Sequence, residues 1–444
     1  MKATDAPDAL IRSGNSRLRA TVAVAMSNYI EAGSIIAIAT SLSMWQGRFH
    51  FGNGVAGDLA AFSPNAFGAA VGAIIGGPLC DRFGRKFIYT YDLLVYMLGM
   101  LFVIFAQSTA MLFIGFMTAG IAVGAGVTAA WTYIAEEAPD DRRAYHVGIA
   151  QLAWSLGPLL GYLLAALVSG MGLTGARIIF GWLFVVALVT WIIRRGLPES
   201  GIWTDRKTSD RRSLTLSESL KGLFSHRINW AALTMLFVVY GAWNTVAGQA
   251  GIFMPRVYAA SGFHSYIEQD LIQALLWGCT CLFTYAGFMK LGDHMSRRLL
   301  FAIGAVAAMV GWAVLAWVTP STWVLLFFAV VWGSSAGIGA QAFYGLWTSE
   351  LFATQYRAGA QGVLFTCARI IVGALSLFFP TMLASLGLSK LGILLVGLLA
   401  VSLLAGTLFA PNTRGKSLRE IELERYGEDL EAQSGARDLK PAAA

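Results

Sequence analysis

Two charged side chains stand inside long apolar runs, where a charge is costly. Glu31 lies in NYIEAGS within the first run, and Arg369 lies in LFTCARIIVG within a run near the C-terminus. Placing a charge at the middle of a bilayer costs at least about 2.5–3.5 kcal/mol on insertion scales. Such a charge is therefore expected only where it forms an ion pair or has a function in transport or catalysis. We therefore expect Glu31 to exchange a proton, the alternative being a carboxylate that hydrogen-bonds a neighbouring helix end.

Arg369 keeps its positive charge at any physiological pH. It needs a carboxylate, backbone carbonyls or an anionic solute as its partner, and Glu31 is one carboxylate that could serve. An arginine also suits the carboxylate of a small organic acid, because the two can form paired hydrogen bonds. The sequence leaves open whether Arg369 forms an ion pair or contacts a solute directly.

Polar and aromatic residues inside the same kind of run could hold a neutral solute. Amide groups can hydrogen-bond hydroxyls, and tryptophan rings can stack on a sugar, although packing and lipid-facing roles are equally open for the rings. The candidates for solute binding are Gln151, Trp154, Trp243, Asn244, Gln249 and Trp347.

No motif for bond-making chemistry accompanies these residues. The sequence contains no HExxH and no GxxxxGK[ST] phosphate loop. Its four cysteines, in or beside apolar runs, include no CxxC pair. The sequence therefore predicts neither an enzyme nor a bound cofactor or metal ion.

The elements that must position these residues are membrane-spanning helices. Of the 444 residues, 57% are hydrophobic and only 13% are charged, against roughly 25% charged residues in a soluble domain. A helix needs about 20 mostly apolar residues to cross the hydrocarbon core. The sequence predicts an all-α membrane protein with twelve transmembrane helices, over 20–44, 55–80, 87–107, 110–135, 145–169, 176–194, 229–258, 267–290, 299–318, 322–350, 358–385 and 390–410.

Lysine and arginine gather at one side of these spans, which predicts the orientation. Basic residues near the N-terminus, in DRFGRK, in the polar stretch 197–228 and after residue 410 fall on one side, which the positive-inside rule makes cytoplasmic. We expect a multi-pass protein of the cell membrane with both termini in the cytoplasm and no cleaved signal peptide. The net charge of +7 is spread over these loops, so no nucleic-acid partner is expected.

The sequence repeats itself at a near-constant offset. Four residues of the first half, Asp81, Glu136, Arg143 and Pro198, recur 212–214 positions later as Asp293, Glu350, Arg357 and Pro411. This predicts a six-helix bundle over 1–196, a cytoplasmic linker over 197–228, a second six-helix bundle over 229–410 and a tail over 411–444. Two such halves would hold a solute between them near the middle of the membrane.

Several loop motifs resemble those of a known family. The run GPLCDRFGRK over 77–86 resembles the loop 2–3 signature of the major facilitator superfamily. The runs YIAEEAP over 133–139, PES over 198–200 and PNTRGKSL over 411–418 resemble motifs of its sugar porter family. The resemblance implies the major facilitator fold, with two pseudo-symmetric bundles. In it, Gln151 would match a sugar-binding glutamine, and Glu31 falls where proton-coupled members have an acidic residue.

The same resemblance implies a cytoplasmic latch between the halves. Glycines let helix ends approach closely, and charged side chains form contacts that break when the protein opens. A solvated charge cluster is the alternative. The predicted latch residues are Gly77, Asp81, Arg82, Gly84, Arg85, Asp92, Glu136, Arg143, Asp293, Arg297, Glu350 and Arg357.

These features together predict a secondary active transporter that works by alternating access. The favoured cargo is a sugar or polyol carried across the plasma membrane with a proton. The alternative is proton-coupled symport of a small carboxylate held by Arg369. A third hypothesis is a sensor or scaffold with a transporter fold, which would bind a solute without moving it. The expected partners are a small solute, a proton and the lipid bilayer, and the resemblance implies a monomer.

Overall fold

Long helices make up the part of the chain that the structure describes. The structure is a computed structural model, and it describes residues 14–138, 142–196 and 216–427. The first part of the predicted linker and the end of the predicted tail lie outside the described residues. Only the backbone is described for residues 14–17, 78, 81, 82, 135–137, 216–220, 354, 355, 358 and 419.

The helices of the first half follow the predicted spans closely. Ser108 caps one of them, because its side chain accepts a hydrogen bond from the Met111 amide at 3.3 Å and so satisfies an N–H that has no partner within the helix. These helices are α1 (Gly14–Phe49), α2 (Asn53–Ala61), α3 (Phe67–Phe83), α4 (Arg85–Ile104), α5 (Thr109–Glu137), α6 (Arg143–Val168) and α7 (Leu173–Arg195).

The second half begins with a short helix in the predicted linker and ends with a short helix in the predicted tail. A π-helical turn, η3 (Thr284–Met289), extends one of its long helices. The helices are α9 (Leu216–Ser225), α10 (Arg227–Ala260), α11 (Tyr266–Phe283), α12 (Arg297–Trp317), α13 (Thr322–Ile338), α14 (Ala340–Leu351), α15 (Thr354–Phe409) and α16 (Leu418–Tyr426).

The predicted twelve-helix architecture is confirmed, with three irregular spans. Ten helical stretches of the described chain are long and apolar enough to cross a membrane. The longest of them, α15, holds two spans, because the chain turns at Gly387, whose φ of 74° suits glycine. The second span is broken between α2 and α3, and the tenth is broken at Gly339 between α13 and α14.

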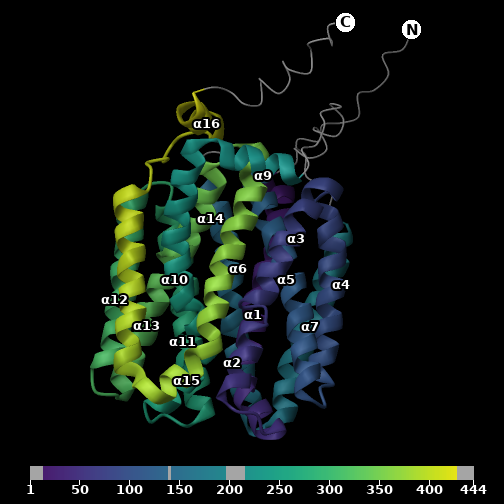
Figure 1. Ribbon diagram of the computed structural model, residues 1–444, viewed down its shortest axis with the longest axis vertical. Coiled ribbons are helices and arrows are strands. Elements are labelled where there is room, and N and C mark those ends of the chain that lie inside the picture. The colour runs from purple at the N-terminus through teal and green to yellow at the C-terminus, as the bar shows by residue number, and fades with distance from the viewer. Residues whose placement is uncertain (1–13, 139–141, 197–215, 428–444) are drawn as a thin grey trace, which may run out of the picture.

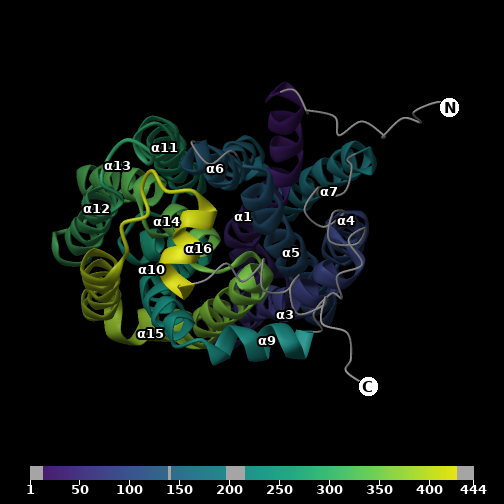
Figure 2. The same ribbon diagram turned by 90° about the horizontal axis from the view of Figure 1, so that it is seen from above.

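The helices form two bundles that lie side by side. Figure 2 shows α3, α4, α5 and α7 on one side and α10, α12, α13 and α14 on the other. The bundles meet where α6 packs against α11 and where α15 packs against α2 and α3. In Figure 1, α9 and α16 lie at one end of the molecule, which we call the tail end, and α15 bends at the opposite end, which we call the bend end.

Candidate functional site

The break in the second span frees a backbone carbonyl inside the bundle. Pro64 has no N–H to donate, so it cannot continue the helical hydrogen-bond pattern. Ser63 takes over part of that pattern, since its hydroxyl donates to the Ala60 carbonyl at 2.7 Å and accepts from the Asn65 amide at 3.1 Å. The Asn65 side chain donates to the Gly248 carbonyl of α10 at 3.1 Å, which fixes the break against the second half. The carbonyl of Asn65 is thereby held between the halves.

Glu31 and Arg369 form a buried ion pair between the two halves. Glu31 on α1 is 1% exposed and Arg369 on α15 is 2% exposed, and the guanidinium donates a hydrogen bond to the carboxylate. The guanidinium also donates to the Asn65 carbonyl at 2.8 Å and lies 4.6 Å from the ring centroid of Phe365. Both charges are therefore matched, as buried charges must be to be tolerated. The pairing that the sequence left open is present in the structure.

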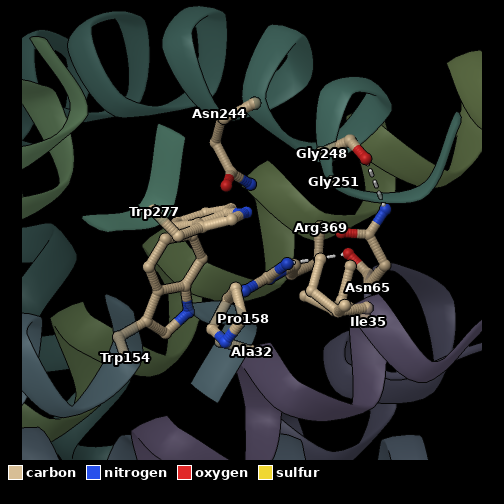
Figure 3. A pocket seen from close by; sticks show the side chains of 12 residues that line it. Ala32, Ile35, Asn65, Trp154, Pro158, Asn244, Gly248, Gly251, Trp277 and Arg369 are labelled. Carbon is tan, nitrogen blue, oxygen red and sulfur yellow. Dashed lines mark hydrogen bonds between the residues drawn. The ribbon is translucent and has the colours of Figure 1, made fainter. Parts of the chain in front are cut away.

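A central cavity lies beside this ion pair. It is narrow, and it is lined from both halves. Figure 3 shows Asn244, Trp154, Trp277 and Arg369 pointing toward one space, next to the hydrogen bonds of Asn65. The rings of Trp154 and Trp277 meet edge to face across the halves, with centroids 5.2 Å apart. The cavity thus offers aromatic surfaces, the side-chain amides of Asn65 and Asn244, and one arginine whose charge is already matched.

An aromatic chamber continues from the central cavity into the second half. Trp154 and Trp277 line both spaces. It adds Trp243, Trp332 and the amide of Gln273. Aromatic rings with a few amides suit the apolar faces and hydroxyl rim of a sugar or polyol better than they suit an ion.

The predicted solute-binding residues divide into two groups. Trp154, Trp243 and Asn244 line the two spaces, and no described residue hydrogen-bonds the Asn244 amide nitrogen. The other three lie outside the lining. Gln249 donates to the Val372 carbonyl at 3.0 Å and accepts from Ser376 at 3.2 Å, which ties α10 to α15.

Gln151 and Trp347 are buried away from the lined cavity surfaces. Neither amide atom of Gln151 has a hydrogen-bond partner among the described residues. Trp347 packs on Phe301 and Phe343 inside the second bundle, with ring centroids 5.6 Å and 4.9 Å away. A contact between either residue and a solute stays a prediction.

Sequence reasoning missed four residues that line the cavities. The sequence could have indicated Asn65, because it follows Pro64 inside an apolar run, and a proline there breaks the helix and exposes backbone groups. The sequence could also have indicated Gln273 and Trp277, since residues four apart share a helix face and these two place an amide beside an aromatic ring. Trp332 ends an apolar run, between Val331 and Gly333, and nothing in the sequence distinguishes it from a packing residue.

Part of the predicted latch meets at the tail end. Glu350 on α14 accepts a hydrogen bond from Arg143 of α6 at 3.0 Å and another from Arg297 of α12 at 2.5 Å. Asp293 accepts from the Ala144 amide at 3.3 Å, which adds a second contact between the halves. The Glu350 carboxylate therefore binds one arginine from each half.

Other predicted latch residues lie elsewhere or cannot be placed. Asp92 lies inside the first bundle, 3.7 Å from Arg194, whose guanidinium donates to the Ala23 and Val24 carbonyls of α1.

Gly84, with φ of 94°, joins α3 to α4. In the second half, Arg357 donates to the Phe352 carbonyl at 3.5 Å. Two more predicted residues, Gly77 and Arg85, are buried. The side chains of Asp81, Arg82 and Glu136 lie outside the described residues.

The bend end is also held shut by contacts between the halves. Arg256 of α10 donates to the side-chain oxygens of Gln46 at 2.6 Å and Asn53 at 3.1 Å. Near them, Gly57 of α2 packs directly on the backbone of Leu377 in α15. The central cavity therefore lies between two closed ends, as in an occluded state of a transporter.

Comparison with known proteins assigns the fold and places the chain among transport proteins. A family model described as Major Facilitator Superfamily matches residues 20–377. The Minor myo-inositol transporter IolF of Bacillus subtilis (strain 168) is 40% identical over 411 residues, which cover 92% of this chain and 94% of that protein. The Glucose transporter GlcP of Staphylococcus epidermidis (strain ATCC 12228 / FDA PCI 1200) is 25% identical over 418 residues, which cover 83% of this chain and 88% of that protein.

A solved structure agrees with this assignment. The proton:xylose symporter XylE from E. coli, bound to 6-bromo-6-deoxy-D-glucose, matches with a TM-score of 0.76 and 18% identity over 92% of this chain and 98% of that one. At that identity the likeness establishes the fold alone, and it confirms the predicted two-bundle architecture. All three similar proteins are named as transport proteins, which agrees with the prediction of a transporter rather than an enzyme.

Proposed function

Since the chain belongs to the major facilitator superfamily, we propose that it is a secondary transporter that carries a polyol or a sugar together with a proton. The observation that carries the proposal is the buried Glu31–Arg369 pair beside an enclosed aromatic cavity between the two halves. Rocking of the halves would open the cavity first to one side of the membrane and then to the other.

A neutral cargo suits this cavity better than a carboxylate. The charge of Arg369 is already matched by Glu31 and by the Asn65 carbonyl, so an organic acid would have to displace a buried partner. The Asn244 amide nitrogen, which no described residue hydrogen-bonds, is suited to a solute hydroxyl, and the tryptophan rings are suited to the C–H faces of a ring. The similarity to a protein named as a myo-inositol transporter supports a cyclic polyol as the first cargo to test.

Glu31 is suited to couple a proton to the movement of the halves. Its carboxylate belongs to α1 in the first half, while Arg369 belongs to α15 in the second. A proton on the carboxylate would remove the charge attraction and leave Arg369 with the Asn65 carbonyl. Protonation would thus loosen α1 from α15, and loss of the proton would draw them together again.

The protein's placement in the membrane is part of the proposal. The bias of lysine and arginine toward one side of the spans supports a tail end in the cytoplasm, with both termini there. We place the functional boundary between the halves in 197–228, with bundles over 1–196 and 229–410. One chain encloses the whole cavity, which supports a monomer embedded in lipid as the working unit.

Uptake by proteoliposomes tests the proposal. With labelled myo-inositol outside and an inward proton gradient, we expect the labelled solute to accumulate inside above its equilibrium level. A protonophore should abolish this accumulation. Glu31→Gln should lose this accumulation but keep exchange of labelled for unlabelled solute, because exchange needs no net proton movement.

Asp58→Asn on α2 is the control, since it removes a carboxylate that lies outside the central cavity lining. Full accumulation by Glu31→Gln would refute the coupling role. Absence of uptake for every polyol and sugar tested would refute the cargo.

A further inference from the structure

A second buried ion pair lies inside the first bundle, apart from the interface between the halves. Asp92 of α4 is 7% exposed and Arg194 of α7 is 2% exposed, and their charged groups lie 3.7 Å apart. Neither residue lines the central cavity or the aromatic chamber. Acidic residues within membrane spans are rare and usually functional, and the site described above gives Asp92 no function.

The guanidinium of Arg194 is bound to α1 more closely than to Asp92. It donates to the Ala23 carbonyl at 2.9 Å, to the Val24 carbonyl at 2.8 Å and to the Ser27 hydroxyl oxygen at 2.9 Å. Its 3.7 Å distance from the Asp92 carboxylate is too long for a hydrogen bond. Asp92 can therefore take up a proton without removing a hydrogen bond from the arginine.

The carboxylate of the tail-end latch is held differently. Glu350 accepts hydrogen bonds from Arg143 at 3.0 Å and from Arg297 at 2.5 Å, so a proton on it would weaken two charge-assisted bonds at once. In Asp92, one oxygen accepts from the Leu93 amide at 2.6 Å, and no side chain among the described residues donates a hydrogen bond to the other. Asp92 is therefore suited to exchange a proton, whereas Glu350 is suited to hold the halves together.

A small space beside this second oxygen of Asp92 has the size of a single water molecule. Its polar lining residues are Asp92, Ser27 and Tyr96. Gly126 of α5 makes room for the carboxylate, because a Cβ there would lie 2.3 Å from Asp92 Oδ2 and 3.3 Å from Ser27 Oγ. A water in this space would have three polar neighbours, which is typical of a buried water.

Hydroxyl groups lead from this space toward Glu31. The Ser34 hydroxyl donates to the Ile30 carbonyl at 2.6 Å, so it must accept in its 2.7 Å contact with the Tyr96 hydroxyl. Tyr96 is therefore the donor of that bond, and its oxygen is left to accept from the space beside Asp92. Ser27 and Ser34 lie four residues before and three residues after Glu31, so the three side chains share one side of α1.

Asp92 lies between the tail end and Glu31. It follows the exposed Lys86 at the start of α4 by six residues, about 9 Å of helix at 1.5 Å per residue. The last turn of α1 lies at the bend end, where Gln46 accepts from α10. Ser27 is therefore about one turn nearer to the tail end than Glu31 is.

Few charged or titratable side chains surround Asp92. Arg194 comes from α7, and its guanidinium lies 5.0 Å from the ring centroid of Tyr89 on α4. From α1 comes the Ser27 hydroxyl, which does not titrate. Near Tyr89 lie three more titratable groups, Cys80 of α3, Arg85 of α4 and Tyr133 of α5. Asp92 is thus the only carboxylate among these described side chains.

We propose that Asp92 is a second proton-carrying residue, which passes the coupled proton between Glu31 and the tail end through the first bundle. An inward-moving proton leaves the Glu31 carboxyl and passes along the hydroxyls of α1 and Tyr96 and one water to the Asp92 carboxylate. Each hydroxyl gives up one proton as it receives another. Asp92 then releases its proton at the tail end. This role rests on the proposed function, because it supplies a route for the proton that Glu31 exchanges.

Proton flux and solute exchange, measured side by side in proteoliposomes, test this role. Myo-inositol added outside should drive protons inward, which a trapped pH-sensitive dye reports. Asp92→Asn should slow this proton flux about 10-fold or more and leave the exchange of labelled for unlabelled myo-inositol unchanged, because exchange needs no net proton movement. Asp92→Glu should restore the flux, since it returns a carboxylate to the same place.

Tyr96→Phe tests the route independently of the ion pair. It removes the hydroxyl between the space and Ser34, so it should also slow proton flux and spare exchange. Tyr89→Phe is the matched control, because its hydroxyl is on the same helix but donates to the Ala129 carbonyl at 3.1 Å and lies outside the space. It should leave both measurements unchanged.

Other outcomes would overturn specific claims. Unchanged proton flux in Asp92→Asn, or equal losses of flux and exchange in it, would refute the relay, and the second result would make Asp92 a structural residue. Unchanged flux in Tyr96→Phe would refute the route. If Asp92→Asn does not fold, Tyr96→Phe decides between a relay and none by the same two measurements. If the unmodified protein moves solute without protons, the proposed coupling itself fails.

Discussion

Arg143 of α6 donates a 3.0 Å hydrogen bond to Glu350 of α14, and this contact joins the two halves at the tail end. Arg297 contacts the other oxygen of the same carboxylate, but it belongs to the same half as Glu350. Opening of the tail end must therefore separate Arg143 from Glu350 while Arg297 stays. The carboxylate keeps one cationic partner in both states, which lowers the cost of opening.

Removal of the shared carboxylate should loosen the tail end. Glu350→Gln deprives two buried arginines of a charged partner, and breaking a buried pair in this way costs about 3–5 kcal/mol. We expect faster hydrogen exchange in α6 and α14, measured by mass spectrometry in nanodiscs. The control is Glu424→Gln, which breaks the exposed pair of Lys416 and Glu424. It should change the free energy of opening, derived from the exchange rates, by less than about 1 kcal/mol. Equal effects of the two changes would contradict a latch at Glu350.

The Glu31–Arg369 pair should show strong coupling in a double-mutant cycle. Glu31→Gln and Arg369→Gln each leave one buried charge without its ionic partner, so each should lower the thermal stability of the purified protein. The double variant removes both charges and should be more stable than Arg369→Gln alone. Thermal unfolding followed by tryptophan fluorescence measures all four proteins. Additive losses would mean that the two residues do not act as a pair.

Trp277 should contribute directly to solute affinity. Trp277→Ala removes an aromatic wall shared by the central cavity and the aromatic chamber, and we expect about a 10-fold loss of polyol affinity, or about 1.4 kcal/mol. Trp323→Ala is the control, because Trp323 is 81% exposed at the start of α13. Binding of labelled myo-inositol measures both. An unchanged affinity in Trp277→Ala would show that the solute does not contact this wall.

A methyl group at Gly57 should obstruct closure of the bend end. A Cβ there would lie 2.5 Å from the Leu377 carbonyl oxygen and 2.9 Å from the Ser376 carbonyl oxygen, both backbone atoms that cannot simply rotate away. Gly57→Ala should therefore slow uptake about 10-fold or more, a barrier increase of about 1.4 kcal/mol, while solute binding from that side persists.

Gly54→Ala, on the same helix, provides the control, because no neighbouring heavy atom lies within 4 Å of its Cβ position. Initial uptake rates and equilibrium binding of labelled solute measure both variants. A loss of binding that parallels the loss of uptake in Gly57→Ala would point to misfolding instead of obstructed closure.

The sequence by itself determined the number of spans and the chemistry kept inside them. Long apolar runs with few charges admit little other than membrane helices, because every backbone polar group in lipid must be bonded within its own segment. The cost of a buried charge singled out Glu31 and Arg369 without any knowledge of the fold. The 213-residue periodicity likewise indicated two related halves.

Only the tertiary structure decided which of these residues meet. Glu31 and Arg369 are 338 positions apart, and their pairing depends on how α1 and α15 pack and on the carbonyl that Asn65 presents at a helix break. The same packing places the Gln249 side chain in hydrogen-bond contact with the α15 backbone and packs Trp347 on other aromatic rings. It also places Trp277 in the wall of the central cavity. Hydrophobicity and helical periodicity define which face of a helix is buried, but contacts between helices arise from side-chain shapes that no local pattern encodes.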